Sequence, residues 1–424
     1  MTVPDTAYIG QIYSQGERQL GGTVGHLDAR QEAALKAVWA KLLAHFDSTA
    51  DTPIPVDKSL VRLSGLAKDA VATDDAAAVA QWYADHAAQV AEVKHQLVRD
   101  KLYLDGHHAP LVPGAFAPLL GDPQDSRRFS SAFWQACMRY ASPDTYVIGS
   151  LRATEWDADK AFAHVVHSVQ RRISQEIDRL MWEGDLLMNR RISENGLCIR
   201  TGCDKFGYPV FVVPVRLNIA RERTDADVEK FAAYSLEKVA QLARKHEGRA
   251  VLLYDFSGFK LENVDLSFSK ILITTVQELY PYTFSATLLF VNSWLFSGIW
   301  KVMRGWMDPV VARRTMIVKD AKALETFIPR DQIPTSMGGQ LKFQYQYVYP
   351  TTDENAKMFD AEGRQRAEHE FAASVEAFSK QTKEWVGGSQ SYNNESRTQA
   401  AAAFDSAAVE LDPYIRARFV EERT

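Results

Sequence analysis

The stretch FVNSWLFSGIWKVMRGWM, residues 290–307, decides the fold because it holds more large apolar side chains than one helix can hide against one core. Its first residues continue an apolar run typical of a buried strand, and the rest has helical spacing. Each large apolar side chain left in water costs about 1.5 to 3 kcal/mol. An apolar partner must cover the outer side of this helix, which predicts a lid over an apolar cavity or a helix that touches a membrane. An ordinary buried helix is the alternative.

Short apolar runs alternate with helical patterns on both sides of this stretch. The runs are rich in Val, Leu, Ile and aromatic residues, and they cover residues 208–215, 249–256, 286–292 and 314–318. One intervening helix is expected to begin near Thr224 and the next after Asp265. Such alternation predicts crossover connections and a mostly parallel sheet, so the expected fold class is α/β. Pro209 and Pro214 favour an edge position for the first run.

Helical patterns dominate the two ends of the chain. Asp28 and its capping-box partner Gln31 predict a helix that presents Leu35, Trp39 and Phe46 on one apolar face. A charged helix with a thin apolar face is expected at residues 362–385, followed by an alanine-rich helix. We therefore divide the chain into an N-terminal helical extension (1–124), a helical lobe (125–196), an α/β domain (197–345) and C-terminal helices with a tail (346–424).

The composition limits the classes of function. Hydrophobic residues make up 46% of the 424 residues and charged residues 24%, which argues against wholesale disorder and against a membrane-embedded protein. The apolar stretch 286–300 is shorter than the roughly 20 residues of a spanning helix. A net charge of -5 offers no field that attracts nucleic acid. No signal-peptide pattern opens the chain and only three cysteines occur, so a cytoplasmic protein is expected.

Motifs for catalysis or metal binding are missing from the sequence. Gly-x-Gly-x-x-Gly, Gly-x-Ser-x-Gly and His-Glu-x-x-His do not occur. His164 and His167 supply at most half of a metal site, and Cys198 and Cys203 have no companion pair. Asp255 ends a predicted strand, but no base or nucleophile accompanies it. We expect no catalytic residue, no metal and no enzyme, with a hydrolase that uses Asp255 and a nearby His as an open alternative.

Seven short motifs stand in order along residues 125–345. They are Leu151-Arg-Ala-Thr-Glu-Trp-Asp157, Tyr208-Pro-Val210, Leu253-Tyr-Asp-Phe-Ser-Gly258, Tyr280-Pro281, Phe296-Ser-Gly-Ile-Trp300, Trp306-Met-Asp-Pro-Val310 and Met337-Gly-Gly339. No single motif is specific, but the ordered set resembles the CRAL-TRIO family of lipid-binding proteins. Gly25-His-Leu and the tail Leu411-Asp-Pro-Tyr-Ile-Arg-Ala-Arg418 further resemble the fungal phosphatidylinositol-transfer subgroup of that family.

The resemblance implies that a helical lobe packs beside a CRAL-TRIO lobe, whose mostly parallel sheet floors a cavity for one lipid, gated by a mobile helix. Residues 294–307 would form the gate, with lipid and membrane contacts from Trp294, Phe296, Trp300 and Met303. The cavity would be lined by Tyr234, Leu252, Tyr254, Phe256 and Phe290. The implied function is non-enzymatic: the protein would move or present phosphatidylinositol or another hydrophobic lipid between membranes.

The resemblance also implies a headgroup site made of basic residues and one acid. Arg152 stays in the first motif although Thr154 replaces its second arginine, and Arg314 keeps a positive charge after Asp-Pro-Val. Tyr282 stands where the family has an acid, and Arg313 is a further candidate for phosphate contact. Loss of the acid weakens selection of inositol. The alternative is therefore that the protein binds a sterol, squalene-like or haem-like ligand and acts as a sensor or scaffold.

The remaining expectations concern cofactors, partners and location. No cofactor is expected, and haem is not favoured because no His stands beside Tyr254. The expected partners are a phospholipid or another hydrophobic lipid and, transiently, a membrane surface. Nucleic acid is not expected, and a lipid kinase is a candidate client. The protein is expected to be cytoplasmic and peripheral at membranes, and a scaffold whose C-terminal helices bind a partner is a second alternative.

Overall fold

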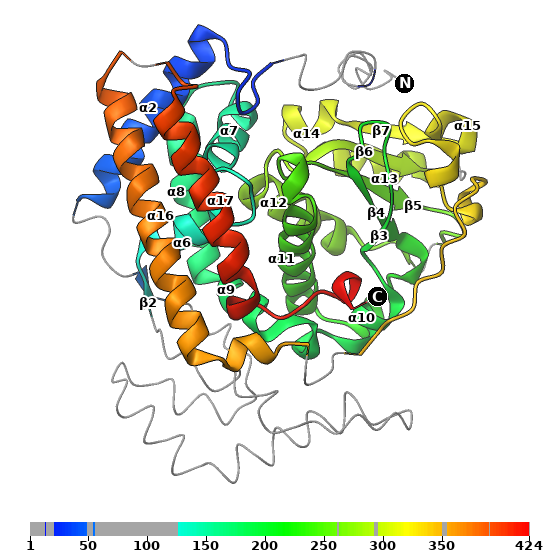
Figure 1. Ribbon diagram of the computed structural model, residues 1–424. Coiled ribbons are helices and arrows are strands. Elements are labelled where there is room, and N and C mark those ends of the chain that lie inside the picture. Colours follow the sequence, from blue (N-terminus) through cyan, green and yellow to red (C-terminus); the bar gives the residue numbers. More distant parts are fainter. Residues whose placement is uncertain are drawn as a thin grey trace.

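The computed structural model describes residues 13, 21–48, 54–55, 126–260, 263–291, 296–349, 354–389 and 391–423. These residues form a bundle of helices packed beside a sheet that has helices on its faces (Figure 1). Helices from both ends of the chain lie together in the bundle. Most of the N-terminal extension, 1–124, lies outside the described residues.

The sheet contains five strands that follow one another in chain order. They are β3 (Ile199–Cys203), β4 (Pro209–Pro214), β5 (Ala250–Asp255), β6 (Phe284–Phe290) and β7 (Thr315–Val318). β3 pairs antiparallel with β4, and all later pairs are parallel. In the central strands, Val212 lies opposite Leu253, and Leu253 lies opposite Leu288. The expected α/β class with a mostly parallel sheet is confirmed.

The edge position expected for the strand with Pro209 and Pro214 is wrong. β4 has a neighbour on each side, and β3 is the edge strand. The two prolines occupy the two ends of β4. The residues between them keep the N–H groups that a central strand must donate, so proline does not prevent pairing on both sides.

Other elements cover both faces of the sheet. α11 (Asp225–Leu242) and α12 (Leu266–Leu279) pack on the face that carries Phe211, Val213 and Leu252. α15 (Ala321–Leu324) and the chain after it cover the opposite face, which carries Val212 and Leu253. Because side chains alternate along a strand, coverage on both sides requires apolar residues at successive positions.

The starts of α11 and α12 are those expected from the sequence. Thr224 is the N-cap of α11 and forms a capping box with Asp227. The side chain of Asp265 caps α12 by accepting a hydrogen bond from the backbone N–H of Phe268 at 2.9 Å. These caps satisfy N–H groups that the first turn of a helix leaves without partners.

The bundle has its own core. Its helices are α2 (Ala29–Phe46), α6 (Phe129–Cys137), α7 (Pro143–Ala153), α8 (Ala158–Ser174), α16 (Ala361–Gly387) and α17 (Glu395–Ile415). Trp39 of α2 and Phe378 of α16 are fully buried in this core. Asp144 of α7 accepts hydrogen bonds from Trp39 Nε1 at 2.7 Å and from Arg397 of α17 at 2.6 Å. The C-terminal helices are thus strapped onto the helical lobe.

One buried carboxylate joins the bundle to the sheet. Glu237 of α11 accepts hydrogen bonds from Arg139 Nε and Arg172 Nη1, both at 2.7 Å, and from the Tyr280 hydroxyl. Arg139 follows α6 and Arg172 belongs to α8, so these bonds hold α11 against the bundle. Burial alone raises the pKa of Glu237, but the two guanidinium groups outweigh it and lower the pKa to about 2.

The helices differ from membrane spans in length or in polarity. α16 has 27 residues, but many of them are charged and exposed. The apolar run 286–300 is divided between β6 and α13 (Phe296–Arg304). None of the helices within the described ranges combines the length and the apolar character needed to cross a bilayer.

Candidate functional site

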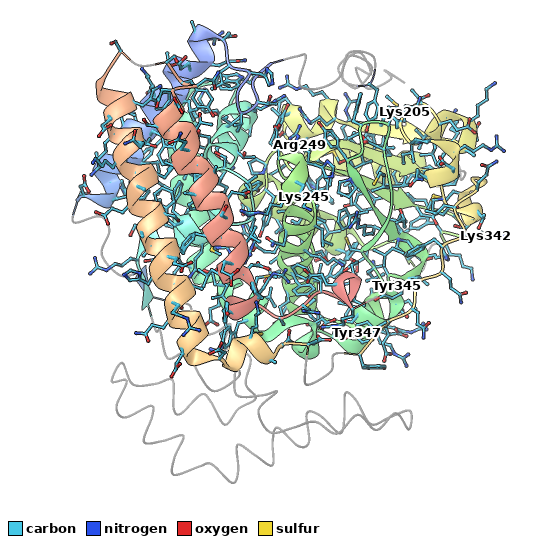
Figure 2. The ribbon with its side chains drawn as sticks, in the orientation of Figure 1. Lys205, Lys245, Arg249, Lys342, Tyr345 and Tyr347 are labelled. Carbon is cyan, nitrogen blue, oxygen red and sulfur yellow. The ribbon has the colours of Figure 1, made fainter. Side chains whose placement is uncertain are left out.

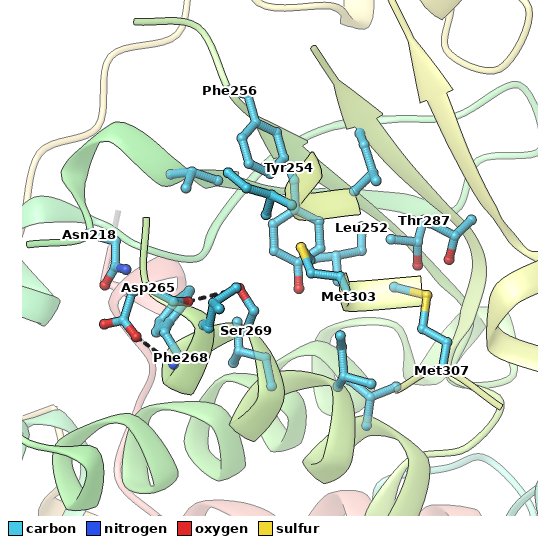
Figure 3. A pocket seen from close by; sticks show the side chains of 18 of the residues that line it. Asn218, Leu252, Tyr254, Phe256, Asp265, Phe268, Ser269, Thr287, Met303 and Met307 are labelled. Carbon is cyan, nitrogen blue, oxygen red and sulfur yellow. Dashed lines mark hydrogen bonds between the residues drawn. The ribbon is translucent and has the colours of Figure 1, made fainter. Parts of the chain in front are cut away.

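A narrow apolar space, the slot, lies between the sheet and α12, and α13 closes it from outside (Figure 3). β5 contributes Leu252 and Tyr254 to one wall, and β6 contributes Thr287 and Leu289. Residues two apart in a strand point to the same side, so these four side chains share one face of the sheet. The floor of the slot is therefore the α12 side of the two central strands.

Two helices and the residue Met307 complete the walls. α12 contributes Leu272, Ile273 and Val276 along one face, as its three-and-four spacing requires. α13 contributes Met303, and Met307 follows the end of this helix. Most side chains around the slot are apolar, which suits hydrocarbon better than a hydrated substrate.

An aromatic cluster fastens α13 to the sheet. Phe296 is 2% exposed, and its ring centroid lies 4.4 Å from that of Phe256. Trp300 stacks on Phe296 with 6.2 Å between ring centroids. Met303 is buried in the same cluster. The inner face of α13 is thus an apolar cover over the slot, while Trp294 lies outside the described residues.

The outer face of α13 is basic and partly apolar. Lys301 and Arg304 are exposed, and Val302 between them is 44% exposed. Cations beside an exposed apolar side chain are typical of helices that rest on an anionic membrane surface. α13 therefore presents different chemistry to the slot and to its surroundings.

The slot is nearly filled in this closed arrangement. Its volume is about 60 Å³, whereas pockets for small ligands usually hold about 300 to 1,000 Å³. The expected open chamber for a lipid is therefore absent here, because α13 and Met307 pack directly against the sheet and α12. A lipid can occupy the slot only if α13 moves away from the sheet.

Three buried arginine side chains surround one tyrosine ring beside the slot, forming the basic corner. The guanidinium carbons of Arg152 and Arg249 each lie 4.1 Å from the centroid of the Tyr282 ring, and that of Arg314 lies 3.7 Å away. Figure 2 shows Arg249 at the junction between bundle and sheet. Cation–π contacts of this kind stabilise by about 2 kcal/mol when water is excluded. The structure thus brings the predicted Arg152, Tyr282 and Arg314 together.

Backbone carbonyls hold the arginines of the basic corner in place. Arg152 Nη1 donates to the carbonyl of Gly22 at 2.9 Å, and Arg314 Nη1 donates to the carbonyl of Phe284 at 3.0 Å. Arg249 donates to the carbonyl of Tyr282 itself. The Tyr282 ring occupies the space among the three guanidinium groups, so a phosphate reaches all three only by displacing it.

The basic corner adjoins one end of the slot. Thr287 lines the slot, and its backbone N–H donates to the carbonyl of Arg314 at 2.8 Å. The half-exposed side chain of the neighbouring Arg313 pairs with Glu155 at 3.4 Å. Arg314 is the one of these two arginines whose guanidinium group is shown against the Tyr282 ring.

Two residues predicted to line the cavity lie elsewhere. Leu289 faces the slot, so its neighbour Phe290 points to the opposite face of the sheet, where it clusters with Leu253. Tyr234 of α11 packs on Phe419 of the C-terminal tail, with 5.6 Å between ring centroids. By contrast, the slot is lined by the predicted residues Leu252, Tyr254, Phe256 and Met303.

The remaining candidates for chemistry make structural contacts. Asp255 accepts a hydrogen bond from the Ser257 N–H at 2.8 Å and pairs with Arg216 at 3.3 Å. His164 Nε2 lies 2.9 Å from the carbonyl oxygen of Gln277, and burial lowers the pKa of its imidazole. Within the described ranges, no three His, Cys, Asp or Glu side chains gather as a metal ion would require.

A larger cavity of about 400 Å³ lies in the bundle among α6, α8, α16 and α9 (Ile177–Glu183). Its walls mix Trp134 and Phe371 with charged side chains. Among the latter, Arg172 and Asp178 are paired at 2.6 Å. Hydrocarbon gains little beside ion pairs, so this cavity suits a lipid chain less well than the slot does.

Several residues around the slot were not found from the sequence. The apolar stripe of α12 predicted the helix, and it could have predicted Leu272 and Val276 as wall residues once the sheet face was known. Arg249 and Asn218 gave no signal, because a single polar residue next to a strand is common in α/β folds. Both were identified only when distant segments were placed together.

Comparison with known proteins identifies the α/β part of the chain. Residues 193–339 match the CRAL/TRIO domain. The sheet, α11, α12 and α13 all fall inside the matched residues.

Similar proteins extend the likeness beyond that domain. The chain is 28% identical over 307 residues to the phosphatidylinositol transfer protein CSR1 of Eremothecium gossypii, covering 69% of this chain and 70% of that protein. It is 26% identical over 301 residues to a CRAL-TRIO domain-containing protein of Schizosaccharomyces pombe, covering 69% of this chain and 67% of that protein. The crystal structure of Sfh5 aligns with a TM-score of 0.42 and 14% identity, over 76% of this chain and 94% of that chain.

Proposed function

We propose that the protein binds one lipid in the slot and carries or presents it between membranes, with no covalent step. The observation that carries this proposal is an apolar slot inside a CRAL/TRIO domain, covered by a helix with an aromatic inner face and a basic outer face. The similarity to a protein named as a phosphatidylinositol transfer protein supports it.

Membrane contact would control the opening of the slot. Moving α13 away in water exposes Phe296 and Met303, at a cost of about 1.5 to 3 kcal/mol for each side chain. At a bilayer the same side chains enter hydrocarbon, which removes that cost. The slot therefore stays closed in water and opens at a membrane, where a lipid exchanges before α13 closes again.

Peripheral attachment follows from the same helix. Lys301 and Arg304 would be drawn to anionic headgroups while Val302 enters the interface. Attachment of this kind is reversible, as a carrier that leaves the membrane requires. If phosphatidylinositol is the cargo, a lipid kinase that acts on the presented headgroup is the proposed client.

The basic corner supports phosphatidylinositol as the first candidate ligand. Guanidinium groups bind phosphate oxygens in pairs, and three of them surround Tyr282, where Arg314 also bonds to the backbone of Phe284 in the wall of the slot. The Tyr282 ring would have to move aside for the phosphate. Its present position supports a second candidate, an apolar ligand such as a sterol or a squalene-like hydrocarbon, which needs no phosphate contact and no cofactor.

The ligand itself is the direct test. Native mass spectrometry of the full chain, purified without detergent, is expected to show one lipid for each protein molecule. Extraction and identification of that lipid separates phosphatidylinositol from a sterol or squalene-like hydrocarbon. Protein that carries no lipid and takes none up from mixed vesicles contradicts the proposal.

Replacing Arg152 with Gln tests the phosphate contact. If the basic corner binds the headgroup, Arg152→Gln is expected to lower phosphatidylinositol transfer about tenfold, because hydrogen bonds to charged groups contribute about 1.5 to 3 kcal/mol. Transfer of a fluorescent sterol by the same variant is the internal reference and should not change. Arg330→Gln removes an arginine paired at the surface with Glu325 and serves as the matched control. Equal phosphatidylinositol transfer by both variants would place the headgroup away from the corner.

A further inference from the structure

One amide in the wall of the slot has a hydrogen-bond donor with no partner. Asn218 is 1% exposed, and its Nδ2 atom makes no hydrogen bond. Its Oδ1 atom accepts a hydrogen bond from Arg223 Nε at 2.8 Å, and Arg223 is held by Asp265 at 2.6 Å. Since an arginine only donates, this contact fixes which amide atom is oxygen and leaves Nδ2 as the unused atom.

Asn218 stands at the end of the slot opposite the basic corner. α12 lines the slot from Asp265 to Val276, a rise of about 16 Å along the helix. Figure 3 shows Asn218 and Asp265 at one end of the slot and Thr287 and Met307 at the other. The length between the two ends matches the roughly 15 Å of hydrocarbon in one leaflet of a bilayer.

The surroundings of Asn218 determine which kind of acceptor its free N–H group can bind. The carboxylate of Asp265 is already occupied by the Phe268 N–H and by Arg223. Val264, which precedes Asp265 in the chain and also lines the slot, is apolar. A buried N–H group without a partner is costly, so a ligand gains by bringing an oxygen to this position. The balanced charges of Arg223 and Asp265 favour an uncharged oxygen over a phosphate.

Orientation separates two classes of lipid. A phospholipid with its phosphate at the basic corner would extend hydrocarbon to Asn218 and leave the donor unsatisfied. A lipid whose polar end is an uncharged oxygen can place that end at Asn218 and its hydrocarbon along α12. Leu266, 42% exposed, lines the same end, so this part of the slot lies close to the protein surface.

We propose that Asn218 determines ligand specificity by donating a hydrogen bond to an uncharged oxygen, either the hydroxyl of a sterol or the ester carbonyl of a neutral glyceride. This inference rests on the proposed binding of lipid in the slot. The uncharged polar end of the ligand then lies near the N-terminal end of α12. The Tyr282 ring keeps its place among the three arginines of the basic corner.

The test measures how the full chain binds three lipid probes that differ in their oxygen atoms. Dehydroergosterol offers a hydroxyl, trioleoylglycerol offers ester carbonyls without a hydroxyl, and squalene offers no acceptor. Asn218→Asp keeps the shape and the contact with Arg223 but replaces the donor with an acceptor. We expect it to weaken binding of the oxygen-bearing probe that fits the slot about tenfold and to leave squalene binding unchanged.

Matched controls give each outcome one meaning. Asn394→Asp makes the same exchange at the N-cap of α17, where Asp caps as well as Asn, and should change nothing. Loss confined to dehydroergosterol identifies the hydroxyl, and loss confined to trioleoylglycerol identifies the ester. Unchanged binding of both probes by Asn218→Asp overturns the inference. So does a wild-type protein that binds phosphatidylinositol but neither neutral probe. Only a wild-type protein that binds no lipid contradicts the proposed function as well.

Discussion

Transfer of lipid between vesicles is expected to fall about 10- to 100-fold in the Trp300→Asp variant. Trp300 is partly exposed on α13 and stacks on Phe296, so it is placed to enter the membrane as the helix opens. An aspartate in its place forfeits about 1.5 to 3 kcal/mol of apolar burial and adds a charge that repels anionic headgroups. A fluorescence assay with labelled donor and acceptor vesicles measures the effect.

Two further variants separate the role of Trp300 in the membrane from a general effect of charge. Val409→Asp introduces the same charge at a 56% exposed position on α17, far from α13 in the sequence, and should transfer lipid at the wild-type rate. Trp300→Phe keeps an aromatic ring and should retain most of the activity. Undiminished transfer by Trp300→Asp, with normal lipid content by native mass spectrometry, would contradict the assignment of α13 as the gate.

The fold was largely predictable from the sequence because its signals are local. The runs that became β4, β5, β6 and β7 are continuous and apolar, as strands covered on both faces must be. The caps at Thr224 and Asp265 gave the starts of α11 and α12. The prediction that β4 is an edge strand was wrong, because the position of a proline within a strand matters more than its presence.

The site was less predictable because it depends on register and on distant contacts. Leu289 and Phe290 are equally apolar, and only the pairing of β6 with its neighbours decides which of them faces the slot. The three arginines around Tyr282 come from separate segments of the chain. The near closure of the slot follows from how α13 packs, which its composition alone cannot show.

A Glu237→Gln variant is expected to lose about 3 to 5 kcal/mol of unfolding free energy at pH 7. Glu237 is fully buried and accepts hydrogen bonds from Arg139, Arg172 and Tyr280. An uncharged amide leaves two buried guanidinium groups without their shared counter-charge, and breaking a buried ion pair from one side costs this much. Arg172 keeps Asp178 at 2.6 Å and Arg139 keeps Asp412 at 3.3 Å, so each guanidinium group retains one weaker-placed partner outside α11. Urea unfolding followed by far-ultraviolet circular dichroism measures the change.

The same carboxylate makes stability depend on pH in a defined window. The folded-state pKa of Glu237 is about 2, below its ordinary value of 4.5. Its contribution of about 3 kcal/mol is therefore complete above pH 4.5 and is lost as the pH falls toward 2. In Glu237→Gln, the unfolding free energy should lack this decrease between pH 4.5 and 2. Glu325→Gln, which removes one partner of a surface ion pair, should still show the decrease and should lose under 1 kcal/mol of unfolding free energy. If the two variants lose stability equally, Glu237 does not hold α11 to the bundle.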